Sequence, residues 1–179
     1  MSGAARFPDG LERRAAAELR AAGRRLEGYA AVFGVPATIG TFTETIAPGA
    51  FRATLASRGD ILALVDHDPG RLLARTGSGT LRLAEDSRGL HFSLDVPDTG
   101  LGRDILALAE RRDLGGMSFT FRPKDEAWPA RDRRELRAVD LLEVSVVQAF
   151  PAYSATSVEA RHRGALSNAA ARRRFLETL

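Results

Sequence analysis

Alternation between apolar and polar positions dominates the chain and indicates a protein built mainly of β-strands. Segments of strand length carry side chains that alternate between two faces, and turns rich in glycine, aspartate and serine separate them. This pattern predicts strands at 26–34, 41–46, 60–65, 72–76, 81–85, 90–96, 117–122 and 135–147. We therefore expect an α+β but mainly β fold, either a compact β-barrel or a strongly bent mixed sheet with a few flanking helices.

Two helices are expected to interrupt the strand pattern. The first follows a turn with proline and glycine and carries Phe51 and Leu55. The second begins at Asp98 or Thr99, either of which can cap the amides of a first turn, and its apolar stripe continues to Arg112. Both helices are short, so they are expected to lie beside the sheet.

The chain divides into a central core and two arginine-rich ends. We expect a basic leader at 1–25, a core domain at 26–160 and a basic tail at 161–179. Residues 11–26 can form a helix, but they offer little apolar surface for packing, so this helix is expected to be loosely held. Residues 123–134 are polar and predict an exposed hairpin tip or loop.

Composition excludes several classes of protein. With 179 residues, of which 44% are hydrophobic and 27% charged, the chain is typical of one globular domain. It has no apolar run near the roughly 20 residues that a membrane-spanning helix requires, and residues 1–10 contain no apolar h-region, so no secretory signal is visible. The lack of cysteine excludes disulfides and, with only three histidines, argues against a structural zinc site.

The net charge of +3 comes mainly from arginines near the two ends. Such ends can contact nucleic acid or an acidic partner. Solvated helix faces and tails account for the same arginines, and we prefer this second interpretation.

One short stretch combines a hydroxyl with a flexible turn. Gly115 and Gly116 lead into an alternating strand whose apolar residues at 117, 119 and 121 face a core, which leaves Ser118 on the opposite face. Glycines allow close backbone approach and leave amides uncovered, so Ser118 can act as a nucleophile beside donors for an oxyanion. The alternative is that Ser118 is only a small residue on the second face of a strand.

His67 and Glu143 are the candidate partners of Ser118. His67 follows the apolar run at 60–65, where a strand leaves the core, and an imidazole there can exchange protons with a nucleophile. It can also be a solvent-facing turn histidine. Glu143 lies among aliphatic residues, where an ionised carboxylate is costly without a partner such as a histidine. An outward-facing glutamate, or one paired with an arginine, is the alternative.

The other two histidines compete less well for the role of base. His91 lies inside an alternating strand and is interpreted as a structural side chain. His162 lies in the basic tail, where nothing in the pattern indicates that it is held in place. The order His67, Ser118, Glu143 also differs from that of an α/β-hydrolase, in which the serine comes first in a Gly-x-Ser-x-Gly turn.

Six short motifs together resemble the prohead maturation proteases of tailed phages, the HK97-type enzymes, which are similar in fold to the herpesvirus assemblins. The motifs run from about residue 28 to 161 in the order Gly28-Tyr29-Ala30-Ala31-Val32-Phe33, Ile46-Ala47-Pro48-Gly49-Ala50-Phe51, Val65-Asp66-His67-Asp68, Gly116-Met117-Ser118-Phe119, Leu142-Glu143-Val144-Ser145 and Pro151-Ala152-Tyr153. The resemblance implies a serine endopeptidase with a compact β-barrel surrounded by helices, so that residues 26–160 form the protease core.

The resemblance also implies roles for individual residues. Ser118 matches the nucleophile and His67 the general base and acid. Assemblins carry a second histidine as the third member, whereas this chain has Glu143 on the corresponding strand, where a carboxylate can orient His67. Backbone amides of Gly115, Gly116 or Ser118, or an arginine from a nearby loop, are candidate oxyanion donors.

The implied biology is procapsid maturation, for a phage, a prophage or a gene transfer agent. The enzyme is expected to act without a metal or cofactor, in the bacterial cytoplasm inside the procapsid, on a scaffold protein or the scaffolding segment of the major capsid protein, and on itself. A homodimer is compatible with this reading, while neither a membrane nor nucleic acid is required. Two alternatives are a catalytically silent head-assembly protein and a β-barrel binding module with basic termini.

Overall fold

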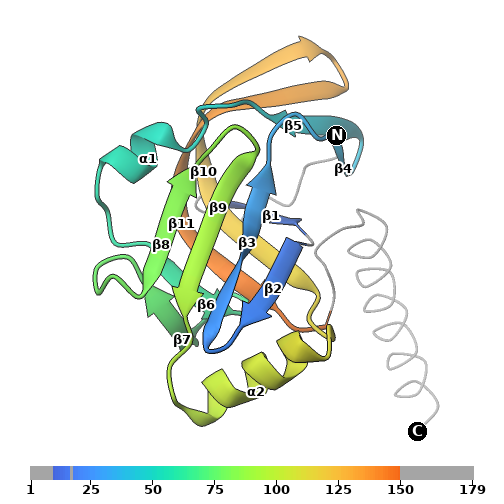
Figure 1. Ribbon diagram of the computed structural model, residues 1–179. Coiled ribbons are helices and arrows are strands. Elements are labelled where there is room, and N and C mark those ends of the chain that lie inside the picture. The colour runs from blue at the N-terminus through green and yellow to red at the C-terminus, as the bar shows by residue number, and fades with distance from the viewer. Residues whose placement is uncertain (1–9, 17, 150–179) are drawn as a thin grey trace, which may run out of the picture.

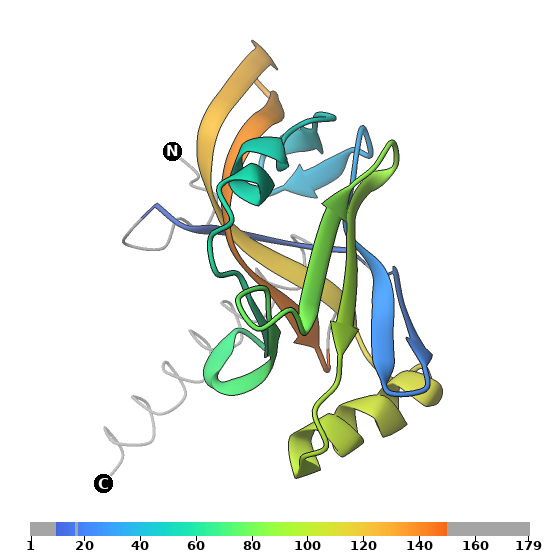
Figure 2. The same cartoon turned by 60° about the vertical axis from the view of Figure 1, so that its left-hand side comes forward.

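The computed structural model describes residues 10–16 and 18–149, and it arranges them as two β-sheets with two helices at their margins (Figures 1 and 2). The first sheet contains β1 (Glu12–Ala16), β10 (Gly116–Ala130), β11 (Arg133–Val147), β5 (Phe42–Ile46), β4 (Ala37–Ile39), β6 (Leu62–Val65) and β7 (Asp68–Arg75). The second contains β2 (Glu18–Ala22), β3 (Arg25–Val32), β9 (Gly89–Asp95) and β8 (Leu81–Glu85) in that order. The helices are α1 (Arg52–Ala56) and α2 (Gly100–Glu110).

The long hairpin of β10 and β11 forms the centre of the first sheet. β11 pairs in parallel with β5 near its beginning and with β6 near its end, while β10 pairs antiparallel with β1. Four register shifts between β10 and β11 bend the hairpin. The strongly bent mixed sheet predicted from the sequence is therefore confirmed, and the described strands do not close into the barrel that was the other prediction.

The core lies between the two sheets and beneath both helices. Aromatic side chains from α1's start and from β10 meet there, with Phe51 edge-on to Phe119 and Phe119 against Phe121. Apolar positions of β3, β8 and β9 pack against the same cluster. Because Phe119 and Phe121 of β10 point into the core, the alternate residues of that strand must face the other side of the sheet.

The second helix begins as the sequence predicts. Thr99 caps α2, and its side-chain oxygen accepts a hydrogen bond from the amide of Gly102 at 3.1 Å. The helix lies across one end of the molecule beside β2 and β7 (Figure 1). Among the described residues, no helix has the length and apolarity to cross a lipid bilayer.

The helix predicted for residues 11–26 is wrong, because this stretch forms β1 and β2. A helix of that composition has no apolar stripe to dock, whereas two strands find complete ladder partners on β10 and β3. The short strand β4 was also not predicted.

The polar stretch at 123–134 forms the distal part of the β10–β11 hairpin, with its turn at residues 131–132, at the top of Figure 1. Within this stretch Arg134 is only 3% exposed, so that position was not the exposed one expected. The basic tail at 161–179, with His162, lies outside the described residues, as does the Pro151-Ala152-Tyr153 motif.

Candidate active site

His67 lies on the two-residue turn between β6 and β7. Both turn residues have left-handed backbone angles, with φ of 52° at Asp66 and 60° at His67, as a type I′ hairpin requires. Neither residue is the glycine that such a turn favours, so the turn costs roughly 1–3 kcal/mol per residue. Hydrogen bonds compensate for this cost, because the amide of His67 donates to Ser145 Oγ at 2.8 Å and the Asp66 carboxylate accepts from the amide of Gln148 at 2.9 Å.

Ser118 lies on β10 between two neighbouring strands. It is paired with Ala15 of β1 on one side and with Ser145 of β11 on the other, and its exposed fraction is 0%. Because Met117, Phe119 and Phe121 face the core, the Ser118 side chain projects from the opposite face of the sheet. There its hydroxyl oxygen lies 2.9 Å from Nε2 of His67.

Glu143 lies on β11 directly opposite Thr120 of β10. Its carboxylate is hydrogen-bonded to Nδ1 of His67 and accepts a hydrogen bond from the Thr120 hydroxyl at 2.6 Å. Burial by itself would raise the pKa of Glu143, but the hydrogen bonds from His67 and Thr120 and the nearby charge of Arg13 outweigh it and hold the pKa below its ordinary value. The carboxylate therefore stays ionised beside the imidazole.

The structure thus brings together Ser118 of β10, Glu143 of β11 and His67 of the β6–β7 turn, which lies 51 and 76 positions away from them in the sequence. With Nδ1 facing a carboxylate, the proton of a neutral imidazole belongs on Nδ1, and Nε2 is left as an acceptor for the serine hydroxyl. This is the arrangement in which a histidine can take a proton from a serine while an acid holds its tautomer.

A backbone carbonyl competes for the same serine proton. The Ser118 hydroxyl also lies 2.8 Å from the carbonyl oxygen of Arg14 on β1 and can donate to it. A hydroxyl has one proton, so Ser118 cannot donate to Arg14 and to His67 at the same time. While β1 is paired with β10, the hydroxyl is therefore divided between two acceptors.

The two glycines named as oxyanion candidates lie at the start of β10. The amide of Gly115 donates to the carbonyl of Val147 at 2.7 Å, so it is already engaged. Gly116 has a φ of 119°, a backbone angle that favours glycine, and is paired with Val147 in the sheet register. An oxyanion role for Gly116 stays a prediction.

Two polar residues of the site were not singled out from the sequence. Thr120 supports Glu143, and Ser145 supports the backbone of His67. The alternation of side chains along a strand could have identified both residues. Thr120 lies on the same strand face as Ser118, and Ser145 lies on the same strand face as Glu143. The competing His91 lies in the second sheet, where its ring packs edge-on against Tyr29 at 5.3 Å between centroids.

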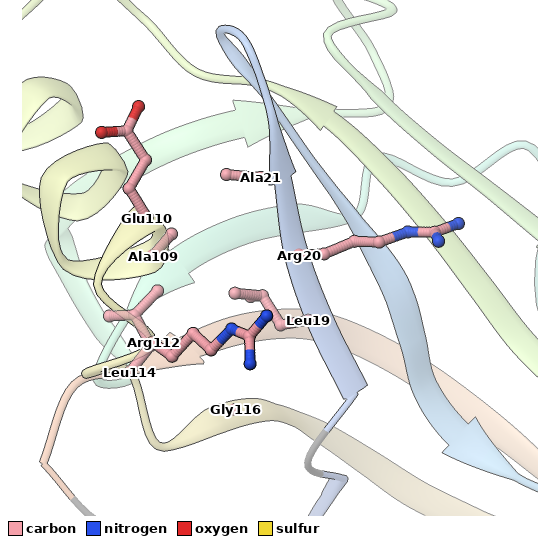
Figure 3. Close-up of a pocket in the computed structure, with 8 residues that line it drawn as sticks. All are labelled: Leu19, Arg20, Ala21, Ala109, Glu110, Arg112, Leu114 and Gly116. Atoms are coloured by element: carbon pink, nitrogen blue, oxygen red, sulfur yellow. The ribbon is translucent and has the colours of Figure 1, made fainter.

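A groove of about 540 Å³ lies close to the start of β10 but is separate from these three residues. Figure 3 shows that α2, β2 and the loop before β10 line it, with Leu19 and Leu114 as apolar walls and Gly116 at its edge. None of Ser118, His67 or Glu143 lines it. In the part of the chain that the structure describes, no cluster of three histidine or acidic side chains could hold a metal ion.

Comparison with protein families agrees with the resemblance drawn from the six motifs. The family model for the caudovirus prohead serine protease matches residues 11–169 of the 179-residue chain, so the match includes β1 and β2. Searches of curated proteins and of solved structures found no match. A match over most of the chain means that this protein belongs to the caudovirus prohead serine protease family.

Proposed function

We propose that the protein is a serine endopeptidase that matures procapsids, with Ser118 as nucleophile, His67 as general base and acid, and Glu143 as the acid that orients His67. The observation that supports this most directly is the continuous hydrogen-bonded path from the Ser118 hydroxyl through both nitrogens of His67 to the Glu143 carboxylate. Family membership supports a role in capsid maturation in general.

The proposed reaction follows from the proton positions. Nε2 of His67 takes the proton of Ser118 as its oxygen attacks the carbonyl carbon of a substrate peptide bond, and the ionised Glu143 stabilises the imidazolium that forms. His67 then returns the proton to the leaving amine, which releases the first product and leaves an acyl-enzyme. A water molecule, activated by the same imidazole, hydrolyses that ester and regenerates the serine.

The substrate that we propose is a scaffold protein or the scaffolding segment of the major capsid protein, inside the procapsid. Self-cleavage is part of the same proposal, and the arginine-rich ends outside residues 26–160 are the segments that it would remove. Intact-mass measurement after expression tests self-cleavage, and a product of unchanged mass would exclude it.

Co-expression with the cognate capsid protein tests the central proposal. The wild-type protein should truncate the capsid protein, and Ser118→Ala and His67→Ala should each abolish the truncation. Ser93→Ala and His91→Ala are matched controls, because they remove the same side chains from β9 of the second sheet and should leave cleavage unchanged. An intact capsid protein beside the folded wild-type chain would instead favour the catalytically silent head-assembly protein.

A further inference from the structure

β1 covers the position that a substrate strand would need. It runs antiparallel along the edge of β10, with Ala15 directly opposite Ser118, and leaves Ser118 with no exposed surface. Extended peptides commonly bind to an enzyme or adaptor by adding a strand to such a sheet edge. Because β1 already fills this edge beside the proposed nucleophile, no second polypeptide can pair there while β1 stays in place.

We infer that β1 is a removable internal occupant of the strand site on β10, and that a substrate segment with an acidic residue two positions before a basic one takes its place. This inference rests on the proposed function of Ser118. It names the chemistry that the site recognises, which is the glutamate and arginine pattern of Glu12 and Arg14 in β1 itself.

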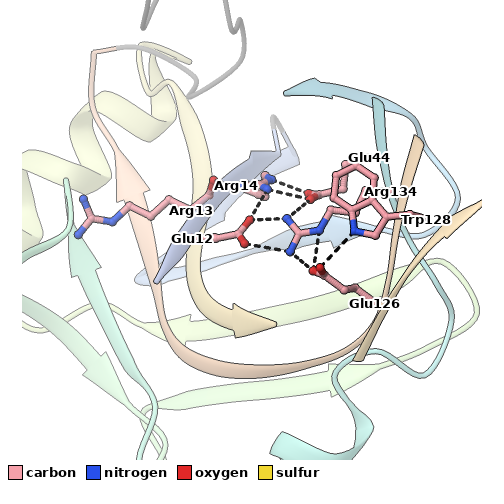
Figure 4. A network of polar contacts seen from close by, with 7 residues as sticks. All are labelled: Glu12, Arg13, Arg14, Glu44, Glu126, Trp128 and Arg134. Carbon is pink, nitrogen blue, oxygen red and sulfur yellow. Dashed lines mark hydrogen bonds and ion pairs between the residues drawn. The ribbon is translucent and has the colours of Figure 1, made fainter. Parts of the chain in front are cut away.

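The side chains of Glu12 and Arg14 in β1 enter a buried ionic cluster, which Figure 4 shows. Arg14 donates two hydrogen bonds to the Glu44 carboxylate, one of them at 2.8 Å, and Arg134 donates two to Glu12, at 2.6 and 2.9 Å. Arg134 is also bonded to Glu126, at 2.8 Å through Nε. Bidentate hydrogen bonds between a guanidinium and a carboxylate are selective for both the charge and the geometry of the bound side chain.

The cluster separates cleanly along the boundary between β1 and the rest of the molecule. Within β1, Arg14 donates to Glu12 at 2.7 Å, so the strand can leave with its two charges paired. Behind it, Arg134 keeps Glu44 at 3.0 Å and its bonds to Glu126. An unpaired buried charge is costly, and after separation Glu12 still has Arg14 and Glu44 still has Arg134, although Glu44 then shares Arg134 with Glu126. This partition fits a strand that can leave as a unit.

The recognition side of the vacated site would be acidic with an aromatic wall. Glu44 supplies the carboxylate for an incoming guanidinium, and the Arg14 guanidinium lies 5.5 Å from the centre of the Phe121 ring. The two terminal nitrogens of the Arg134 guanidinium supply donors for an incoming carboxylate two residues before that arginine. A segment with the reversed order of charges would place its arginine against Arg134 and its glutamate against Glu44.

The bond from Ser118 to the Arg14 carbonyl fits the same inference. With β1 bound, that carbonyl draws the hydroxyl proton away from His67. When β1 leaves, the Arg14 carbonyl is lost as an acceptor. Of the two acceptors of the Ser118 proton, Nε2 of His67 then remains. The strand therefore both blocks access to Ser118 and weakens its activation.

The test is a charge reversal within β1 of the full-length chain. Glu12→Arg with Arg14→Glu keeps the composition and net charge but sets like charges against Arg134 and Glu44. The matched control is Glu135→Arg with Arg137→Glu on β11, which reverses an exposed pair of the same types at the same spacing. Each protein is treated with a fluorophosphonate probe, labelling is followed by intact mass, and hydrogen exchange reports whether β1 has left β10.

The variant with reversed charges in β1 should react with the probe at least about tenfold faster than the wild type, which corresponds to about 1.4 kcal/mol. The control variant with reversed charges in β11 should react at the wild-type rate. A synthetic peptide with the sequence of residues 10–18 should slow the faster labelling again. The same peptide with Glu12 and Arg14 exchanged should not slow it. If the native and exchanged peptides act alike, the proposed charge pattern is refuted.

Unchanged labelling in a variant whose β1 amides exchange freely would overturn the inference and leave the protease proposal intact. Unchanged exchange of β1 would overturn it as well. If no protein labels but the peptide of residues 10–18 still binds the reversed variant by fluorescence anisotropy, the strand site stands and the serine mechanism fails. If the β1 variant does not fold, hydrogen exchange of the wild-type protein decides whether β1 can leave. The inference then requires the amides of β1 to exchange well before those of β11.

Discussion

The clearest consequence of the site geometry concerns the charge on Glu143. Glu143→Gln keeps the size of the side chain and an oxygen that can accept from Thr120, but it removes the negative charge beside His67. Two opposite unit charges about 4 Å apart interact by about 4 kcal/mol at an effective dielectric constant near 20. At about 1.4 kcal/mol per factor of ten, losing that interaction with the imidazolium predicts a rate about 10³-fold lower.

The loss should fall on the chemical step and not on substrate binding. In the proposed mechanism the carboxylate stabilises a charge on His67 that exists only after the proton leaves Ser118, so kcat should fall while KM changes little. A glutamine can also donate its own amide proton to Nδ1, which would favour the wrong tautomer and increase the loss. The assay is cleavage of the cognate capsid protein over time, with product quantified by gel or mass spectrometry.

Glu143→Gln should fold like the wild type, because Thr120 and His67 still have a polar partner of the same shape. Retention of more than about a tenth of wild-type kcat, in a preparation where Ser118→Ala is inactive, would show that Glu143 does not orient a catalytic histidine. The short contact with His67 would then be only a structural ion pair.

Three further predictions concern the neighbours of the site. Thr120→Val removes a hydrogen-bond donor to the Glu143 carboxylate. One such bond is worth about 1.4 kcal/mol, so capsid cleavage should slow about tenfold, while the free energy of unfolding should fall by no more than about 1 kcal/mol. Arg134→Met removes one of the two guanidinium groups that Glu12 and Glu44 share and leaves both carboxylates to Arg14, so it should lower the free energy of unfolding by about 3–5 kcal/mol in urea titration. Burial would raise the pKa of Glu12, but the hydrogen bonds and charges of Arg134 and Arg14 hold it below the ordinary value of 4.5. A carboxyl group whose pKa is lowered by folding stabilises the folded state above its unfolded pKa, and this contribution is lost as the pH falls. The free energy of unfolding in urea should therefore fall as the pH drops from about 5 to 3, and Glu12→Gln should flatten this slope.

Local pattern was sufficient for most of the strands and for the second helix. The period of two placed β8 at the predicted bounds of 81–85, and Thr99 capped α2 because its hydroxyl can reach an amide three residues on. These features depend on neighbouring residues alone, so they can be read without the fold. The same local logic failed at 11–26, since the preference of alanine and arginine for helix was overridden by sheet edges that exist only after β3 and β10 have formed.

The sequence by itself determined which side chains could do the chemistry. A serine after two glycines, a histidine at a strand end and a glutamate among aliphatic residues each stand out because their local surroundings make them costly or reactive. Only the tertiary structure decided that these three meet, because their contacts join β10, β11 and the β6–β7 turn across more than fifty positions of the chain. It also decided that β1 lies over the serine, since pairing between distant strands depends on register and shape that no local pattern carries.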